Sequence, residues 1–298
     1  MSRNKTSRTV GYGKDQFSFE DCPCCNDWSV RTTDGKFVRH LAGIGSIDYR
    51  YVHTHAKFMI AKFNDKRPER EIVKEYVKDN LCLSSGRTIE DAKRIGAIKR
   101  QWDDLMLRLQ ARPKLREFRN LYDMYAGREY HNLDHVMACL SELKDAKTTA
   151  ENPNAVEFAL WFHDAVYDTH RNDNEERSAA LAREVAERLG LDKKFILAVS
   201  WLIFATSHFG TPINNDMRLI CDVDLAIMGA DTRTFNAYDT AVRKEYSWVK
   251  DTEYTAARTK LLSALASRPR IFLTNHFMEK YEETARANLA RVLATPTE

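Results

Sequence analysis

The sequence predicts a mainly α-helical protein, with a helical bundle over residues 96–298 preceded by a small α+β region over residues 1–95. From Thr88 onward every strong hydrophobic pattern has a helical period, whereas the earlier patterns alternate. Hydrophobic residues make up 43% and charged residues 30% of the 298 residues, which is typical of a folded domain. A chain of this length can bury a core as one large or two modest domains.

The first part of the chain carries strand signals. Asp34-Gly35 stands between two alternating stretches, which predicts a β-hairpin. Residues 49–63 are aromatic, β-branched and partly alternating, so we expect a strand there. Pro68 is a favourable first-turn residue, and a short predicted helix runs from it to about Asp79.

Helices are expected through the rest of the chain. The sequence TIED at 88–91 resembles a capping box and begins a helix that ends near Leu109. Asp173 with Glu176 marks another start, and Gly190 marks an end. Further helices are predicted at about 113–125, 128–144, 153–167, 173–189, 193–207, 216–229, 234–249, 252–266 and 276–294.

Charge is unevenly distributed, although the net charge is only +3. Residues 1–100 hold 20 Lys and Arg against 13 Asp and Glu, and the remaining residues hold 26 against 30. Aromatic and basic residues also interleave between Tyr49 and Arg67. These features have two interpretations for residues 1–95: an accessory region that contacts nucleic acid, or solvated faces without a partner.

Composition also restricts the compartment. No apolar run approaches the roughly 18 residues of a membrane span, and residues 1–9 lack the apolar segment of a signal peptide. We therefore expect a cytoplasmic protein without membrane contact. Six cysteines are too few and too scattered for a disulfide framework. The spacing of Cys22, Cys24 and Cys25 fits no zinc finger or ribbon.

The segment Trp161-Phe162-His163-Asp164 places two ionisable residues in an apolar helical pattern. Burying an unpartnered histidine and aspartate there is expensive, and metal coordination removes that cost. Upstream, the i, i+4 spacing of His131 and His135 is expected to place both imidazoles on one helical face. The ordered set of such residues on successive apolar helices predicts a bound metal ion.

A third apolar helix carries Asp222 and Asp224. Two residues apart, they cannot share a helical face, so one can reach the metal while the other caps a helix, pairs with an arginine or orients a ligand. Two histidines with carboxylates form a mixed nitrogen and oxygen set. Such a set suits Mn, Co, Fe, Zn or Mg and does not choose among them.

From about Trp102 to the end, the chain resembles the HD superfamily of metal-dependent phosphohydrolases, most closely a branch of predicted hydrolases. The resemblance rests on the segments GREYHNLDH (127–135), WFHDAVYD (161–168), DNEERSA (173–179), ATSH (205–208), DVDLA (222–226) and RKEY (243–246). It covers about two thirds of the chain and excludes residues 1–100. It implies an HD-type helical bundle for residues 96–298.

The resemblance also implies residue roles. The four metal ligands would be His135, His163, Asp164 and Asp224, with Asp164 also counted as catalytic. The segment from His131 to His135 is similar to the His-Asn-x-x-His phrase of cyclic-nucleotide phosphodiesterases, which share the fold. That likeness makes His131 the general acid, and an imidazole that titrates near neutral pH suits the role.

The chain departs from family members that bind two transition metals, because these carry two additional histidines between the His-Asp pair and the last aspartate. His170 and His208 occupy that interval, and His170 lies in a polar turn. We therefore expect one tightly held ion, with at most a second, weakly bound ion on Asp164. The same departure argues against a di-iron oxygenase.

Other residues have a functional and a structural interpretation. Arg128 and Arg243 could clamp a phosphate or pair with nearby acids. Glu175 could orient water or ribose, or be a favourable acid at a helix start. His208 could bind a phosphate or a second ion, or satisfy carbonyls at a helix end. Asn132 and Asp222 are expected to support the ligands by hydrogen bonds. The aromatic residues Trp161, Trp201, Tyr246 and Trp248 are expected in the core, with stacking of one of them on a base as the alternative.

The resemblance implies a hydrolase that cleaves a phosphoester of a small nucleotide-like substrate: a nucleoside monophosphate, a deoxynucleoside triphosphate or a cyclic nucleotide. Metal-activated water would attack phosphorus, and His131 would protonate the leaving group. The alternative is a nucleic-acid-associated binding or sensor protein with a basic N-terminal module and an HD domain of reduced activity. A scaffold without metal is the third hypothesis.

Overall fold

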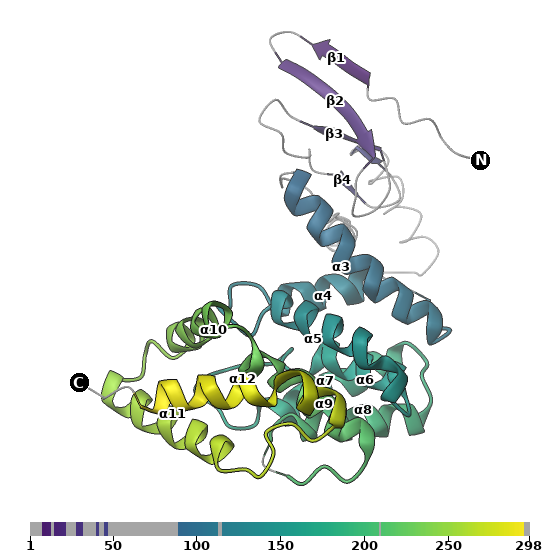
Figure 1. Ribbon diagram of the computed structural model, residues 1–298. Coiled ribbons are helices and arrows are strands. Elements are labelled where there is room, and N and C mark those ends of the chain that lie inside the picture. Colours follow the sequence, from purple (N-terminus) through teal and green to yellow (C-terminus); the bar gives the residue numbers. More distant parts are fainter. Residues whose placement is uncertain are drawn as a thin grey trace. The chain divides into compact units, whose positions relative to one another are not determined.

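A computed structural model gives the structure of the protein (Figure 1). The described residues are 8–12, 15–21, 28–31, 40–41, 45–46, 89–112, 115–208 and 210–294. The chain divides into two compact units. The first holds residues 1–107 and 113–120, and the second holds 108–112 and 121–298. The expected boundary after residue 95 falls within helix α3 (Ile89–Arg108), and the separate roles of the two parts stay predictions.

The first unit contains short strands. β1 (Arg8–Tyr12), β2 (Asp15–Asp21) and β3 (Trp28–Arg31) form an antiparallel sheet in that order, and β4 (His40–Leu41) pairs with β5 (Gly45–Ser46). The predicted hairpin turn at 34–35, strand at 49–63 and helix at 68–79 lie outside the described residues. The α+β character of residues 1–95 therefore stays a prediction.

The described part of the chain from residue 89 is mainly helical, as predicted (Figure 1). The α-helices after α3 are α4 (Leu115–Met124), α5 (Leu133–Ala146), α6 (Pro153–Phe162), α7 (Asn174–Arg188), α8 (Lys193–Ala205), α9 (Asn215–Leu225), α10 (Thr232–Glu245), α11 (Asp251–Ala266) and α12 (Asn275–Leu293). Two 3₁₀ turns, η1 (Lys147–Thr149) and η2 (Ala226–Gly229), follow α5 and α9. None of the described helices is long and apolar enough to span a bilayer.

Local capping explains where these helices begin and end. The side chains of Asn152, Asp192 and Asn214 accept hydrogen bonds from backbone N–H groups in the first turns of α6, α8 and α9. Gly190 follows α7 with a φ of +77°, a left-handed conformation that favours glycine. Each signal is local in sequence, so most predicted boundaries agree with the structure to within a few residues.

Two boundaries differ at the residues expected to carry function. α5 begins at Leu133, because Asn132 caps it, so His131 precedes the helix and does not share a helical face with His135. α6 ends at Phe162, so His163 and Asp164 lie in the turn that follows it. The prediction of one helical face for the two histidines is wrong.

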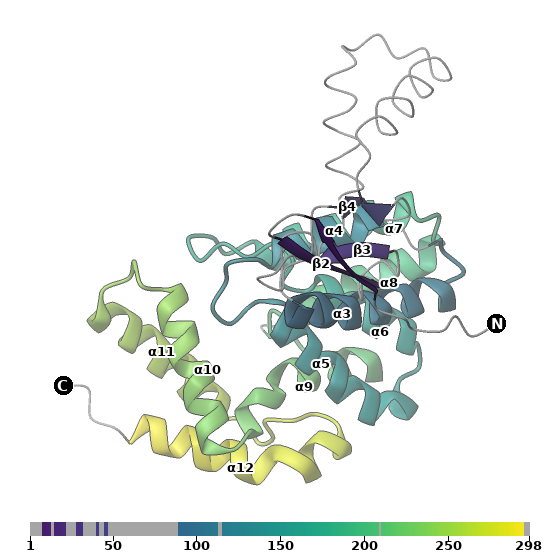
Figure 2. The same ribbon diagram turned by 90° about the horizontal axis from the view of Figure 1, so that it is seen from above.

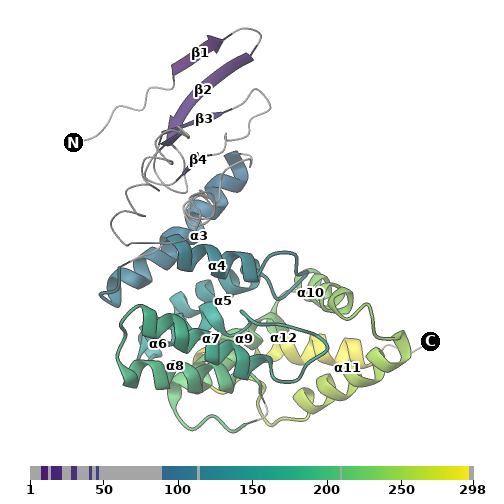
Figure 3. The same cartoon turned by 180° about the vertical axis from the view of Figure 1, so that it is seen from behind.

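Within the second unit, α7 and α8 pack side by side, α8 also packs on α6, and α12 packs on η2. α10 and α11 lie on one side of this unit and α6, α7 and α8 on the other (Figures 2 and 3). Large aromatic side chains fill its interior: Tyr125, Phe158, Trp161, Phe162, Phe235, Phe272 and Phe277. Trp161 is buried as expected, but Trp201 and Trp248 are 55% and 53% exposed, so their assignment to the core is wrong. Tyr246 is only partly buried.

Candidate metal centre

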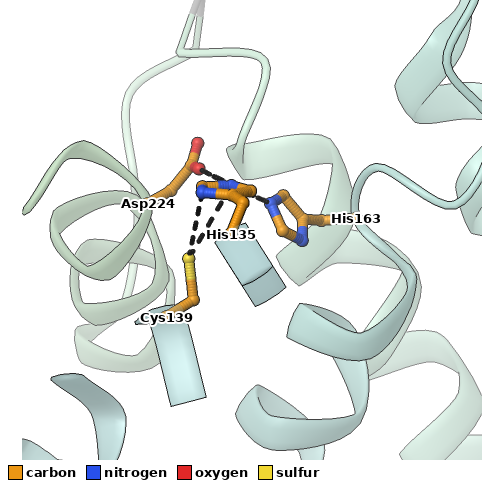
Figure 4. A group of neighbouring side chains, drawn as sticks. All are labelled: His135, Cys139, His163 and Asp224. Atoms are coloured by element: carbon orange, nitrogen blue, oxygen red, sulfur yellow. Dashed lines mark hydrogen bonds and ion pairs between the residues drawn. The ribbon is translucent and has the colours of Figure 1, made fainter. Parts of the chain in front are cut away.

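Three separate elements bring ionisable side chains to one point in the second unit. The first turn of α5 supplies His135, the turn after α6 supplies His163 and Asp164, and the last turn of α9 supplies Asp224. Figure 4 shows His135 and His163 facing each other, with Asp224 on the neighbouring helix. Residues far apart in the sequence therefore meet at this point, and their assignment as metal ligands stays a prediction.

The donor atoms of this group lie close together. His135 Nε2 is 3.1 Å from His163 Nε2. Asp164 Oδ2 lies 3.1 Å from His163 Nε2 and 3.5 Å from His135 Nε2. Asp224 Oδ1 lies 3.2 Å from His135 Nε2 and 3.5 Å from His163 Nε2. Donors that share an ion at about 2.1 Å are themselves separated by roughly 3.0–3.5 Å.

Hydrogen bonding prepares His163 as a ligand. Its Nδ1 donates to the carbonyl oxygen of Leu160 at 2.9 Å, which holds a proton on Nδ1 and turns Nε2 toward the group. The side chain is 1% exposed. The orientation is therefore set by the end of α6 and does not depend on solvent.

The group has an excess of negative charge. Burial would raise the pKa values of the Asp164 and Asp224 carboxyls, but the neighbouring histidines hold both pKa values below their usual range. Burial would lower the pKa of His163, but Asp164 and Asp224 raise it well above its usual value. Both carboxylates thus favour a positive charge between them, which a bound divalent cation would supply.

Cys139 adjoins this group and was missed in the sequence. Its Sγ is 3.8 Å from Nδ1 and 3.7 Å from Nε2 of His135, and the four side chains His135, Cys139, His163 and Asp224 offer ligand atoms within 4.8 Å of one another (Figure 4). Burial and the nearby carboxylates raise the pKa of the thiol well above its usual value. The sequence does contain a signal for this contact, because Cys139 follows His135 by four residues and so lies one helical turn away on the same face of α5.

The cluster can hold a metal ion, and the donor types fit a divalent one. Sγ of Cys139 is nearly equidistant from both ring nitrogens of His135, so it faces the ring and not the lone pair of Nε2. Asp164 Oδ2, in contrast, lies beside Nε2 of both histidines. Asp164 and Cys139 are thus both adjacent to the two histidines, and the choice of Asp164 as a ligand stays a prediction.

His131 lies beside the cluster, in the segment before α5, and is held by Glu245 at the end of α10. Its Nδ1 is 2.6 Å from Glu245 Oε2, while Glu245 Oε1 accepts the backbone N–H groups of Tyr130 and His131 at 2.8 and 2.9 Å. Burial would raise the pKa of Glu245, but these hydrogen bonds and the His131 charge lower it. The imidazole also stacks on Tyr167, with ring centroids 4.0 Å apart. Glu245 and Tyr167 were not among the predicted site residues.

Asn132 and Asp222 act on the backbone around the cluster. The Asn132 side chain accepts the N–H groups of Asp134 and His135, which anchors the first turn of α5. Asp222 is buried and accepts the backbone N–H groups of Leu273 and Thr274, both at 2.7 Å, at the start of α12. Of the two aspartates in α9, Asp224 therefore faces the cluster and Asp222 faces α12.

His208 and Glu175 lie at the edge of the cluster. Nε2 of His208 is 2.9 Å from Asp224 Oδ2, and its φ of +59° is unusual for a residue other than glycine. Arg268 donates to its carbonyl oxygen and helps to hold this conformation. Burial and the charge of Asp164 raise the pKa of Glu175, which is partly buried at the start of α7.

Both predicted phosphate-clamp arginines bind the chain itself. Arg128 donates to the carbonyl oxygens of His131, Asp164 and Ala165, so it braces the two segments that carry the cluster. Arg243 donates to the carbonyl oxygens of Tyr246 and Val249 and to Asp251. Their contact with a substrate stays a prediction.

A groove of about 410 Å³ borders the cluster along α5. Its walls include His135, Cys139, Asp224, Glu142 and Tyr281. Comparison with models of protein families, with curated proteins and with solved structures finds no match to this chain. The described part of the chain from residue 89 is therefore mainly helical and contains a side-chain cluster that can hold a metal ion.

Proposed function

We propose that this protein is an HD-type, metal-dependent phosphohydrolase. The observation that carries the proposal is the convergence of two imidazole nitrogens and two carboxylate oxygens at 3.1–3.5 Å, from His135, His163, Asp164 and Asp224. Along the chain these residues occur as a histidine, then a His-Asp pair, then an aspartate, which is the order of the HD motif. The resemblance of residues 102–298 to that superfamily supports the same conclusion.

The four side chains would hold one divalent ion, which we take as Mn, Co, Fe, Zn or Mg. A bound ion supplies a Lewis acid and activates water for attack on phosphorus. Arg128, Asn132 and the Leu160 carbonyl orient the segments and rings that bear the ligands. His208 binds the second oxygen of Asp224 and restrains that carboxylate.

His131 is the proposed general acid. Glu245 accepts the Nδ1 proton of His131, which holds the imidazole in one orientation. The Nε2–H is then the proton available for the leaving oxygen. Stacking on Tyr167 fixes the ring plane, and Tyr167 is itself within 3.3 Å of the Tyr246 hydroxyl.

The proposed substrate is a small nucleotide-like phosphoester: a nucleoside monophosphate, a deoxynucleoside triphosphate or a cyclic nucleotide. This choice follows from the resemblance to the HD superfamily, whose members typically act on such substrates. Glu175 is the residue that we propose to orient water or a sugar hydroxyl, from its place at the start of α7. The nucleic-acid-binding alternative depends on residues 1–95, most of which lie outside the described part of the chain. No observation in the described part favours that alternative.

The test combines metal analysis with turnover. Purified full-length protein is analysed for bound metals and then assayed for phosphate or nucleoside release from a nucleotide panel, with Mn²⁺, Co²⁺, Mg²⁺ and Zn²⁺ supplied separately. Asp164→Asn keeps the side-chain shape but removes the charge. The matched control is Asp145→Asn, an exposed acid on the helix that carries His135.

We expect about one ion per chain and turnover that Asp164→Asn abolishes and Asp145→Asn preserves. A folded wild-type protein that binds no divalent ion would refute the metal centre. A protein that binds metal but releases no phosphate or nucleoside from any substrate would refute the phosphohydrolase and leave the metal centre intact.

A further inference from the structure

An exposed aromatic pair lies near the general acid. The rings of Trp248 and His170 are stacked, with centroids 4.0 Å apart and planes 15° from parallel. Trp248 is 53% exposed and the His170 side chain 63% exposed. An indole normally buries most of its surface, so an ordered and exposed stack calls for an explanation.

Several contacts hold the pair in place. Trp248 Nε1 donates to Thr169 Oγ1 at 2.8 Å, and the Asp168 carboxylate accepts the His170 backbone N–H at 3.0 Å. The indole is thereby oriented without being covered. An aromatic surface that is fixed before binding loses little conformational entropy when a further ring stacks on it.

The pair is connected to His131 through a short chain of contacts. Tyr167, which stacks on His131, is two residues from Thr169, and its hydroxyl meets that of Tyr246, two residues from Trp248. The loop after α6 and the loop after α10 therefore meet on the side of the cluster where the leaving group is protonated. Both loops belong to the second unit.

We infer that Trp248 and His170 form a binding surface for a planar aromatic ring in the leaving group of the phosphoester, such as a nucleobase. The inference rests on the proposed function, because His131 defines the leaving-group side. Stacking recognises the π-face and not a hydrogen-bonding pattern, so the surface selects aromatic leaving groups and tolerates different bases.

The alternative is that the pair only fastens the two loops together. Adenosine 5′-monophosphate and ribose 5-phosphate separate these roles, because they share the phosphoester and sugar but only one carries a base. Trp248→Ala is compared with Trp248→Phe, which keeps a ring. Trp201→Ala is the matched control, because Trp201 is exposed to nearly the same extent on α8. Thermal melts establish that each variant is folded.

We expect Trp248→Ala to raise KM for adenosine 5′-monophosphate by about tenfold while kcat and the constants for ribose 5-phosphate stay unchanged. Trp248→Phe should recover most of the loss, and Trp201→Ala should have no effect. Equal losses for both substrates, or no loss for either, would overturn the inference. Binding of adenosine 5′-monophosphate is measured in parallel by calorimetry. If the wild type hydrolyses neither ester, the proposed function fails. In that case, weaker binding by Trp248→Ala than by the wild type still supports the aromatic binding surface. Absence of saturable binding to the wild type would overturn it.

Discussion

Replacing Glu245 with glutamine tests how the candidate general acid is held. The carboxylate accepts three N–H groups: the backbone N–H of Tyr130, the backbone N–H of His131 and the His131 ring N–H. A carboxylate has two accepting oxygens, whereas the glutamine amide has one acceptor and one donor group. In either orientation of the glutamine amide, its NH₂ group faces an N–H donor: either the His131 ring or the two backbone N–H groups.

The magnitude follows from the two orientations. If the amide nitrogen faces His131, Nδ1 must give up its proton, and a neutral imidazole loses most of the general-acid contribution of about 10²–10⁴-fold. If the amide oxygen faces His131, the two backbone N–H groups lose their acceptor, at a cost of about 1–3 kcal/mol for each group left buried. We therefore expect either that kcat falls by at least about 10²-fold for an alkyl phosphoester or that stability falls by about 2–6 kcal/mol.

The assay compares an alkyl phosphoester with its nitrophenyl counterpart, because a nitrophenolate leaves without needing a proton. Loss of a general acid should depress only the alkyl reaction. Glu282→Gln is the matched control, since Glu282 likewise accepts two backbone N–H groups, those of Ile271 and Phe272. It should lower stability without changing the dependence on the leaving group. Equal depression of both reactions by Glu245→Gln, or wild-type turnover of both together with wild-type stability, would refute this role of His131 and Glu245.

The same pair predicts a pH dependence of stability. Hydrogen bonds and the His131 charge lower the pKa of Glu245 in the folded protein relative to its ordinary value. Its contribution to stability is therefore complete above the ordinary glutamate pKa and is lost as the pH falls through the folded-state pKa. Denaturant unfolding at neutral and acid pH measures this, and Glu245→Gln should reduce the difference between the two.

Three further predictions concern the metal centre. Removing divalent ions with EDTA should lower Tm, and adding the ion back at a hundred times its Kd should restore about 2.7 kcal/mol of folding stability. Scanning fluorimetry measures the change in Tm. An unchanged Tm would contradict the prediction. Cys139→Ala should retain a stoichiometric ion in metal analysis, because the thiol faces the His135 ring, whereas loss of the ion would make Cys139 a ligand. Asn132→Ala should cost about 1 kcal/mol in urea unfolding and weaken metal binding, because the cap fixes the turn that bears His135; unchanged metal affinity would separate the cap from the site.

Sequence was sufficient for most helices because their boundary signals are local. Asp192 and Asn214 cap the helices that directly follow them, and Gly190 ends the helix that precedes it. The start of α5 was misplaced for the same kind of reason. Asn132 is a cap, but its neighbours His131 and His135 have a helical spacing that overrode the capping signal.

Sequence was sufficient for the candidate site only where the chemistry is unusual. His163 and Asp164 are conspicuous because ionisable residues are rare in an apolar segment, and both lie in the cluster. Glu245 could not be assigned in this way, because it lies 114 residues from His131 and ends an ordinary polar helix. Its role depends on a tertiary contact that no local pattern encodes.

Asp222 and Asp224 show why carboxylates in apolar helices are ambiguous. Both lie within one turn of α9, Asp222 buried and Asp224 partly buried, and both have partners that compensate the loss of hydration. For Asp222 the partners are the backbone N–H groups that begin α12, and for Asp224 they are three imidazoles. A helix start and a cationic centre offer the same thing, a concentrated positive potential, so a buried aspartate satisfies either. The two aspartates differ in the direction that they face. Each residue turns the helix by about a hundred degrees, so Asp222 and Asp224 are about two hundred degrees apart around the α9 axis and contact opposite neighbours.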